Sequence, residues 1–219
     1  MAGRVRAYVG LGANVGDAPA TLAAAARVLA GLPGARLRGV SRLYATRPVG
    51  VEDQPDFHNA VAALDVPAGP DPETGALALL LALKGIEAAF GRRRRRRWGP
   101  RELDLDLLLF GRHRIHVRRP LDARSDDPAR EAVGWLDVPH ASAVERLFVL
   151  APLADLAPGL VPPGWGTTVA TRRRVRAVLD GPDAVRAVAA WDAGAGGWSP
   201  TPPGSAPAAA PRSRRPTRG

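Results

Sequence analysis

The sequence predicts a folded domain that combines β-strands with α-helices. The chain has 219 residues and is 46% hydrophobic, which is enough to build one sizeable core. Apolar residues alternate at period two in several short segments, as they do in half-buried strands. Two longer segments instead begin with an acid and a proline and continue with helical apolar spacing.

Composition limits the cellular setting and the partners. No apolar run approaches the roughly 20 residues that cross a bilayer, and the first residues lack the apolar core of a signal peptide. The chain has no cysteine, which excludes disulfides and thiolate metal sites, so we expect a cytoplasmic protein with no membrane partner. The net charge of +10 suggests nucleic-acid binding. However, Lys84 is the sole lysine among 31 basic residues, a bias typical of genomic base composition, and we expect no specific nucleic-acid partner.

The first strand and helix are predicted near the N-terminus. Val5 to Leu11 alternates as a strand does, and Gly12-Ala13-Asn14 then turns the chain. Asp17 is a suitable N-cap, with Pro19 in the first turn of a helix that Pro33-Gly34 ends. A strand, a polar turn and a helix often frame a ligand, although most such turns are only connections.

Two further strands and a long loop are predicted next. Residues 35–44 form the second strand, and the third runs from Phe57 to Leu64. The segment 46–56 between them is rich in proline and polar residues, and loops of this length are usually functional or disordered. Phe57 and Asn59 share one strand face, where a ring can stack on a flat heterocycle and an amide can bind its edge. A core phenylalanine and a turn asparagine explain this pair about equally well.

A second helix is predicted to begin at the N-cap Asp71 with Pro72 and to end near Phe90. This helix is apolar nearly all round, so we expect it to be largely buried. Glu87 near its end therefore needs a partner. Pairing with an arginine is favoured over binding of ligand hydroxyls.

The stretch from Gly91 to Phe110 carries the most informative pattern of the chain. Six consecutive arginines precede a Trp-Gly-Pro-Arg turn, after which leucines alternate with other residues. This alternation predicts a strand with Asp104 and Asp106 on one face, about 6–7 Å apart. Two carboxylates this close repel each other unless a cation lies between them. Magnesium on carboxylates, beside arginines near phosphates, is typical of phosphoryl transfer; a solvated strand face beside a basic loop is the plainer alternative.

The segments after this strand carry weaker signals. His113 and His116 would lie on opposite faces of a strand, so we do not interpret them as a metal pair. Residues 117–134 are predicted to form a loop or flap. His140 precedes a helix that carries Arg146 and could hold an anion there, although a lone histidine is more often structural.

The folded domain is expected to occupy residues 1–165. Residues 166–192 are predicted to form a basic extension, with helices at about 167–179 and 183–191. Residues 193–219 are low in complexity and are predicted to be disordered. No internal repeat is visible, and we expect a monomer.

Taken together, these segments resemble the hydroxymethyl-dihydropterin pyrophosphokinase family of folate biosynthesis. Residues 97–108, RWGPRELDLDLL, fit the RWGPR-x-x-D-[LIVM]-D signature of that family, which is highly specific. Further matches, in the right order, are YVGLGAN at 8–14, TRPVGVEDQPDFHNAV at 46–61, VPH at 138–140 and ERLFVLAPLADLAP at 145–158.

The resemblance implies a fold and a reaction. The fold is a ferredoxin-like α+β arrangement, in which an antiparallel sheet is flanked by helices in three α-β-α layers. The reaction transfers an intact pyrophosphoryl group from ATP to 6-hydroxymethyl-7,8-dihydropterin and releases AMP. ATP and this pterin are therefore the expected small-molecule partners, and two Mg²⁺ ions are the expected cofactors.

The resemblance also implies roles for individual residues. Asp104 and Asp106 match the two magnesium ligands. Pterin contacts are implied for Thr46, Val49, Phe57, Asn59, Trp98 and Phe148. ATP contacts are implied for Glu87, Arg94, Arg97, Trp98, Arg101, His140 and Arg146. The implied catalytic set consists of Arg92, Arg94, Arg101, Asp104 and Asp106, in which Arg92 and Arg94 match mobile-loop arginines that close over ATP.

The chain departs from the family pattern at several positions. Ala13 stands where serine is more usual, Phe57 where many members have tyrosine, and Ala141 where a larger residue is common. Trp135 and Asp137 occupy positions where a basic and a hydroxyl residue can approach ATP. Three alternatives stay open: a nucleotidyltransferase with an Asp-x-Asp metal pair, a nucleic-acid-binding protein that uses the arginines, and an inactive family member. The intact acid pair disfavours the last.

Overall fold

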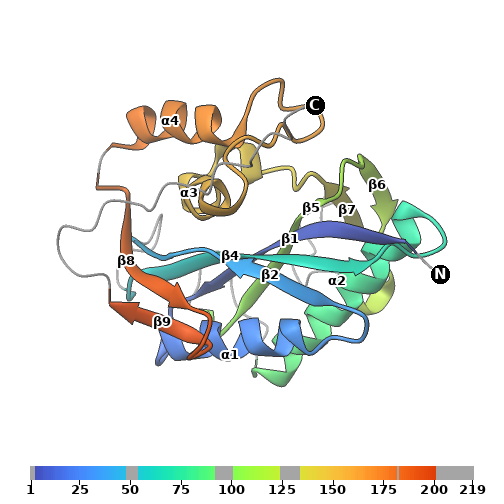
Figure 1. Ribbon diagram of the computed structural model, residues 1–219, viewed down its shortest axis with the longest axis horizontal. Coiled ribbons are helices and arrows are strands. Elements are labelled where there is room, and N and C mark those ends of the chain that lie inside the picture. Colours follow the sequence, from blue (N-terminus) through green and yellow to red (C-terminus); the bar gives the residue numbers. More distant parts are fainter. Residues whose placement is uncertain (1–2, 48–53, 92–100, 124–133, 182, 201–219) are drawn as a thin grey trace, which may run out of the picture.

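A seven-stranded sheet lies between two layers of helices (Figure 1). The computed structural model describes residues 3–47, 54–91, 101–123, 134–181 and 183–200. In chain order the elements are β1 (Arg4–Ala13), α1 (Ala18–Ala30), β2 (Arg36–Val40), β3 (Leu43–Thr46), β4 (Phe57–Pro67), α2 (Pro72–Ala89), β5 (Asp104–Phe110), β6 (Ile115–Arg118), the 3-10 helix η1 (Leu121–Ala123), β7 (Trp135–Val138), the 3-10 helix η3 (Ala143–Glu145), α3 (Leu147–Leu156), α4 (Val169–Asp180), β8 (Val185–Asp192) and β9 (Gly197–Pro200).

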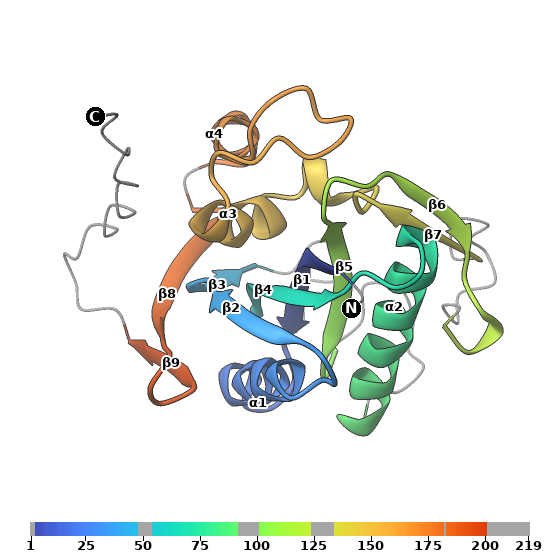
Figure 2. The same cartoon turned by 45° about the vertical axis from the view of Figure 1, so that its right-hand side comes forward.

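The sheet is antiparallel and has the order β5-β1-β4-β3-β8-β9, with β2 also paired to β4. Helices α1 and α2 cover one face, and α3 and α4 lie over the other (Figures 1 and 2). The predicted α+β class, with an antiparallel sheet flanked by helices, is therefore confirmed. A separate two-stranded sheet is formed by β6 and β7. The segment 117–134, which was expected to be one loop, connects these two strands, and its first two residues belong to β6.

The two main helices begin where the sequence predicts. The side chain of Asp17 accepts a hydrogen bond from Ala20 N at 3.0 Å, and that of Asp71 accepts one from Thr74 N at 2.8 Å. The expectation that helix α2 is largely buried is met on one side only, because Leu80 and Leu83 are buried whereas Leu81 is 41% exposed. Within the described residues, no helix combines the length and the apolar character needed to cross a membrane.

Alternation along the central strands supplies a core on each face of the sheet. On one face, Val9 and Leu11 of β1 pack with residues from α1 and α2, and all are buried. On the other face, Tyr8 of β1 and Val61 of β4 pack with residues of α3. The next β1 positions on this second face are Gly10 and Gly12. The apolar core therefore stops there and leaves a side-chain-free surface on the sheet.

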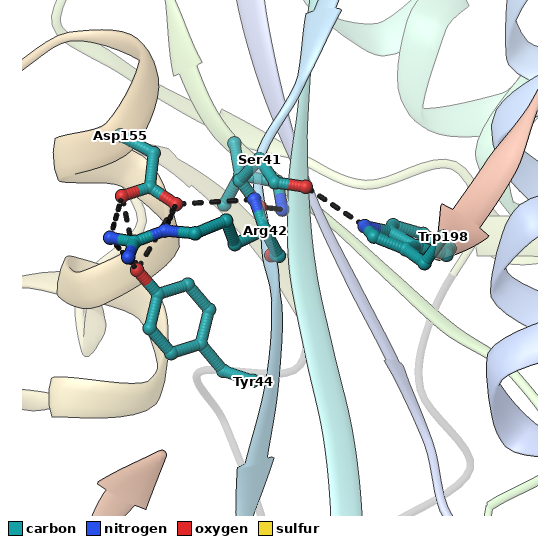
Figure 3. A network of polar contacts seen from close by, with 6 residues as sticks. Ser41, Arg42, Tyr44, Asp155 and Trp198 are labelled. Carbon is teal, nitrogen blue, oxygen red and sulfur yellow. Dashed lines mark hydrogen bonds and ion pairs between the residues drawn. The ribbon is translucent and has the colours of Figure 1, made fainter. Parts of the chain in front are cut away.

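The predicted second strand is in fact two strands, β2 and β3, separated by Ser41 and Arg42. The side chain of Ser41 accepts a hydrogen bond from Val61 N at 2.9 Å, which ties the break to β4. Arg42 forms an ion pair with Asp155 of α3 at 2.6 Å, and the Tyr44 hydroxyl lies 3.0 Å from the same carboxylate (Figure 3). The break thus anchors α3 to the sheet, a long-range constraint that local sequence does not reveal.

The C-terminal part of the sheet corrects two predictions. The segment expected to be a helix at 183–191 is the strand β8, which pairs with β3. Residues 193–200, expected to be disordered, form a turn and β9, and Trp198 Nε1 donates to Ser41 O at 2.9 Å (Figure 3). The open edge of β3 offers backbone partners that outweigh local helical preference. Helix α4 is confirmed, with Thr168 as its N-cap, and residues 201–219 lie outside the described part of the chain.

Candidate active site

The floor of the candidate site is the glycine-lined part of β1. Gly10 and Gly12 pair with Asp106 and Asp104 of β5, and Gly12 also pairs with Asn59 of β4. A Cβ placed on Gly12 would lie 3.4 Å from the Asn59 side-chain oxygen. Gly12 therefore leaves room for a ligand between the polar side chains of Asn59 and Asp104, whereas a Cβ on Gly10 would contact the Leu108 side chain at 3.5 Å. Sequence reasoning missed this floor, although the period-two glycines of the YVGLGAN segment were a usable signal.

A pocket of about 190 Å³ opens on this floor. Its walls come from β1, β3, β4, β5 and α3. The lining residues are Gly10, Leu11, Gly12, Thr46, Arg47, Phe57, Asn59, Ala60, Val61, Arg101, Asp104, Asp106, Leu108, Arg146, Phe148 and Val149. This volume is below the roughly 300–1,000 Å³ typical of sites for drug-sized ligands. It therefore suits a small heterocycle, and a whole nucleotide would have to extend beyond it.

Four residues predicted to contact the pterin line this pocket together. Phe57 and Asn59 come from β4, Thr46 from the end of β3, and Phe148 from the first turn of α3. Asn59 is 8% exposed, and its Nδ2 donates to Thr46 Oγ1 at 3.0 Å. This contact orients the amide and leaves its oxygen toward Gly12. The guanidinium of Arg146 lies 5.7 Å from the centre of the Phe148 ring, which brings positive charge to the rim.

The two aspartates of β5 line the same pocket, as the alternating leucines predict. Asp104 and Asp106 are both partly exposed, whereas Leu105 between them is fully buried on the opposite face. Arg101 Nη1 lies 2.6 Å from Asp104 Oδ2. Carboxylates and a guanidinium are thus gathered at the β5 end of the pocket, and Phe57 and Asn59 line it from β4 on the other side of β1.

The electrostatic surroundings keep Asp106 ionised. Burial acts to raise the pKa of its carboxyl group. The positive charges of His140, Lys84, Arg101 and Arg146 act in the other direction and outweigh burial, so the pKa lies below its ordinary value. A carboxylate that stays charged at neutral pH is what a metal ligand requires.

The donor set fits magnesium that is shared with a phosphorylated substrate. Mg²⁺ prefers oxygen ligands and is usually held by one or two carboxylates together with waters and substrate phosphates. Across the described ranges there is no group of three or more histidine, cysteine or acidic side chains that could hold a metal alone. Asp104 and Asp106 would therefore supply only part of such a coordination sphere, and phosphate oxygens would have to complete it.

Other predicted phosphate contacts surround this acidic end. Arg101 and Arg146 line the pocket, and the charge of His140 acts on Asp106. The backbone N–H of His140 donates to Leu108 O at 2.9 Å, which holds the segment after β7 against β5. The implied site residues Val49, Arg92, Arg94, Arg97 and Trp98 lie outside the described residues.

Glu87 is buried, being only 2% exposed, and Lys84 Nζ lies 2.9 Å from it. The prediction that Glu87 pairs with a cation is confirmed, and among the described residues that cation is Lys84. Its carboxylate also accepts a hydrogen bond from Leu105 N at 2.7 Å. This enclosure favours a role behind the strand over direct contact with a nucleotide.

Asn14 and Arg119 are two functional candidates that sequence reasoning missed. Asn14 is 2% exposed; its Oδ1 accepts from Arg101 N at 2.7 Å, and its Nδ2 donates to Gln54 Oε1 and Pro55 O. It joins the segments that precede Phe57 and Asp104. Arg119 Nε donates to Trp135 O at 2.8 Å; burial lowers the pKa of Arg119, and the charge of Asp106 acts on it. The Gly-Ala-Asn turn was a weak signal for Asn14, and nothing local indicated Arg119.

Comparison with known proteins identifies the family. The family described as 7,8-dihydro-6-hydroxymethylpterin-pyrophosphokinase (HPPK) matches residues 8–158. The chain belongs to this family. A 2-amino-4-hydroxy-6-hydroxymethyldihydropteridine pyrophosphokinase of Pseudomonas aeruginosa is 44% identical over 155 residues, which cover 71% of this chain and 82% of that protein. The enzyme of the same name from Bacillus subtilis is 38% identical over 150 residues, covering 68% and 77%.

The fold is also found in solved structures. The crystal structure of wild-type Plasmodium falciparum HPPK-DHPS matches with a TM-score of 0.62 at 13% identity and covers 86% of this chain. The present chain spans about half, 49%, of that longer protein. At this identity the match concerns the fold alone.

Proposed function

We propose that this chain transfers a diphosphate group from ATP to 6-hydroxymethyl-7,8-dihydropterin in tetrahydrofolate biosynthesis, with release of AMP. One observation carries the proposal: two aspartates and four of the six predicted pterin contacts line a single pocket. Phe57 and Asn59 lie on the β4 side of this pocket, and the two carboxylates with Arg101 lie on the β5 side. A flat alcohol bound beside Phe57 would present its hydroxyl to the carboxylates.

The pterin is proposed to bind between Phe57 and Phe148. Stacking supplies affinity, and the buried amide of Asn59, oriented by Thr46, supplies specificity. A ligand whose edge does not match would leave that amide without partners at a substantial free-energy cost. The small pocket volume supports a bicyclic ring and excludes the adenosine part of ATP from the same space.

Asp104 and Asp106 are proposed to bind two Mg²⁺ ions together with the phosphates of ATP. Bound Mg²⁺ would neutralise phosphate charge and lower the pKa of the attacking hydroxyl. Arg101, Arg146 and His140 are proposed to bind phosphate oxygens, where charge accumulates in the transition state. Val49, Arg92, Arg94, Arg97 and Trp98 stay predictions from the family resemblance, as does a direct nucleotide contact of Glu87.

The pterin hydroxymethyl oxygen forms a bond to the β-phosphorus of ATP while the bond from that phosphorus to the α,β-bridging oxygen breaks. The bridging oxygen leaves on AMP, and the hydroxyl proton passes to solvent. The β- and γ-phosphoryl groups stay joined, so the products are AMP and the pterin diphosphate.

A product assay tests the proposal. The full chain is incubated with MgATP, with and without 6-hydroxymethyl-7,8-dihydropterin, and the nucleotides are separated by chromatography. We expect AMP in amounts equal to the pterin diphosphate, dependent on the pterin and abolished by EDTA. Release of inorganic pyrophosphate with transfer of AMP would indicate a nucleotidyltransferase instead, and failure to form pterin-dependent AMP would refute the proposal.

We also propose that the central part of the fold is ferredoxin-like. The chain order strand, helix, strand, strand, helix, strand is found if β2 and β3 count as one interrupted strand. The order β5-β1-β4-β3 then corresponds to the interleaved arrangement of that fold. In this description β8 and β9 are additions to one edge.

A further inference from the structure

We propose that Lys84 and Glu87 form a positioning pair that holds the two peptide groups between Asp104 and Asp106. Neither residue is proposed to contact the substrate in this role. The inference rests on the proposed metal-dependent function of the two aspartates. In this proposal Lys84, the sole lysine of the chain, affects the reaction indirectly, by holding the backbone of β5.

The pair lies on the open side of β5. This strand is at the end of the sheet, and among the described strands it pairs with β1 alone. The backbone N–H of Leu105 donates to Glu87 Oε1 at 2.7 Å, and Lys84 Nζ donates to Leu105 O at 3.4 Å. The same Nζ lies 2.9 Å from both Glu87 oxygens. Two side chains from α2 thus take the place of a neighbouring strand for one residue.

Leu105 is the residue through which both aspartates can be fixed. Its N–H belongs to the peptide plane shared with Asp104, and its C=O belongs to the plane shared with Asp106. Glu87 therefore holds the plane on one side, and Lys84 holds the plane on the other. The Leu105 side chain is fully buried in the core, so the segment is held from its edge as well as from its rear face.

Fold stability alone is a poor explanation for this pair. Removing a lysine and a glutamate from water is costly, and well-packed apolar residues at such positions are often at least as stabilising. Polar groups that orient metal-binding residues are different, because their loss typically reduces metal affinity or activity by about 10–100-fold. The contacts of the pair with the backbone between the two aspartates therefore point to such a positioning role.

The experiment uses the full chain, four variants of the pair and one control variant. Lys84→Met removes the donor and the charge, and Glu87→Ala removes the acceptor. Lys84→Arg and Glu87→Gln each keep a hydrogen-bonding group at the same place. Glu73→Gln is the matched control, because Glu73 is an exposed acid in the first turn of the same helix. Thermal melting establishes that each variant is folded.

Three measurements separate a positioning role from a structural one. The first is the Mg²⁺ concentration that gives half-maximal AMP formation, and the second is binding of Mn²⁺ with a non-hydrolysable ATP analogue, followed by electron paramagnetic resonance. The third is pterin affinity, followed by fluorescence. For Lys84→Met and Glu87→Ala we expect metal affinity to fall by about 10–100-fold with unchanged pterin affinity. Lys84→Arg and Glu87→Gln should restore part of the loss.

Amide hydrogen exchange at Leu105 provides a direct check of the contact. Exchange should accelerate in Glu87→Ala and stay unchanged in Glu73→Gln, because only the former loses the acceptor. Unchanged metal affinity in folded Lys84→Met and Glu87→Ala would overturn the inference, even if Leu105 exchanged faster. An inactive wild type would refute the proposed function instead, and the Mn²⁺ measurement would still decide the role of the pair because it needs no turnover.

Discussion

The strands β3 and β5 border the catalytic half of the sheet and are completed in different ways. Along β3, residues 43–46 pair with β8, so backbone groups continue the sheet toward the C-terminus. At Leu105 of β5, Lys84 and Glu87 take the backbone groups instead. Backbone pairing adds further strands to the sheet, whereas the two side chains bind the backbone of one residue only. Among the described strands, β5 carries the two aspartates and has its outer edge bound by side chains and not by another strand.

The two borders also support different parts of the proposed reaction. Residues near β3 hold the pterin side, since Thr46 ends that strand and the Arg42–Asp155 ion pair anchors α3, which carries Phe148 (Figure 3). Residues near β5 hold the metal and phosphate side. If this division is real, changes on one side should alter one substrate and leave the other unaffected.

The largest effect is expected for Asp106→Asn. The amide has the same size but cannot supply the negative charge that a metal ligand needs, so several kcal/mol of transition-state stabilisation should be lost. We expect kcat for AMP formation to fall about 1,000-fold or more, with pterin affinity retained. Turnover equal to that of wild type would refute the role of Asp106 as a metal ligand. Thermal melting of the variant controls for loss of the fold.

The next largest effect is expected for Phe148→Ala on the pterin side. Loss of one aromatic face typically costs about 1–3 kcal/mol for a stacked heterocycle, so pterin affinity should fall about 10–100-fold. The Mg²⁺ concentration for half-maximal activity should not change. Fluorescence titration and a magnesium series measure the two quantities on the same preparation. A parallel loss of metal affinity would show that the two sides are not independent.

The local sequence predicts the chemically active residues of this site better than the residues that hold them in place. The period-two leucines place Asp104 and Asp106 correctly, because alternation on a strand needs no knowledge of the rest of the chain. The joining roles of Asn14 and Asp155 depend on segments far away in the sequence, and no local pattern announces them. The Lys84–Glu87 pair could have been predicted from the sequence, because residues three apart on a helix are neighbours.

The same reasoning explains the errors at the C-terminal end. The segment of β8 alternates weakly, so its strand character depends on the edge of β3 that it joins. Composition suggested disorder from residue 193 onward, but Trp198 packs edge-on against Trp191 with 4.8 Å between ring centres. A low-complexity composition is an average over the segment, so it does not reveal that one aromatic side chain in it packs against a partner.

A pair of truncations tests how much the β8 side contributes. A chain that ends at residue 200 keeps every element of the sheet and should match wild type in stability and turnover. A chain that ends at residue 192 loses β9 and Trp198, with the ring burial and the hydrogen bond to Ser41. We expect its free energy of unfolding to fall by about 1–3 kcal/mol, which calorimetry would detect as a lower Tm, with AMP formation largely retained below that Tm. An equal Tm for the two chains would show that β9 contributes no stability.

The smallest effect is expected at Asp65, whose ion pairs serve as a contrast to the Lys84–Glu87 pair. Asp65 lies 2.5 Å from both Arg6 and Arg38, which are 43% and 48% exposed. Hydrogen bonding to Arg6 is the main cause that lowers the pKa of Asp65 to about 2. Because the pKa is depressed in the folded state, this contribution to stability is present above pH about 4 and is lost as the pH falls toward 2. Solvent screening limits it to about 1 kcal/mol.

Asp65→Asn should therefore lower the free energy of unfolding by about 1 kcal/mol near pH 6, and the difference from wild type should vanish near pH 2. Urea unfolding at several pH values measures this difference. Turnover and magnesium dependence should stay at wild-type values, because Asp65, Arg6 and Arg38 do not line the pocket. If Asp65→Asn shifted the magnesium dependence as much as Lys84→Met, a general loss of sheet rigidity would explain both variants. A specific effect of Lys84→Met alone would locate metal positioning at the β5 border.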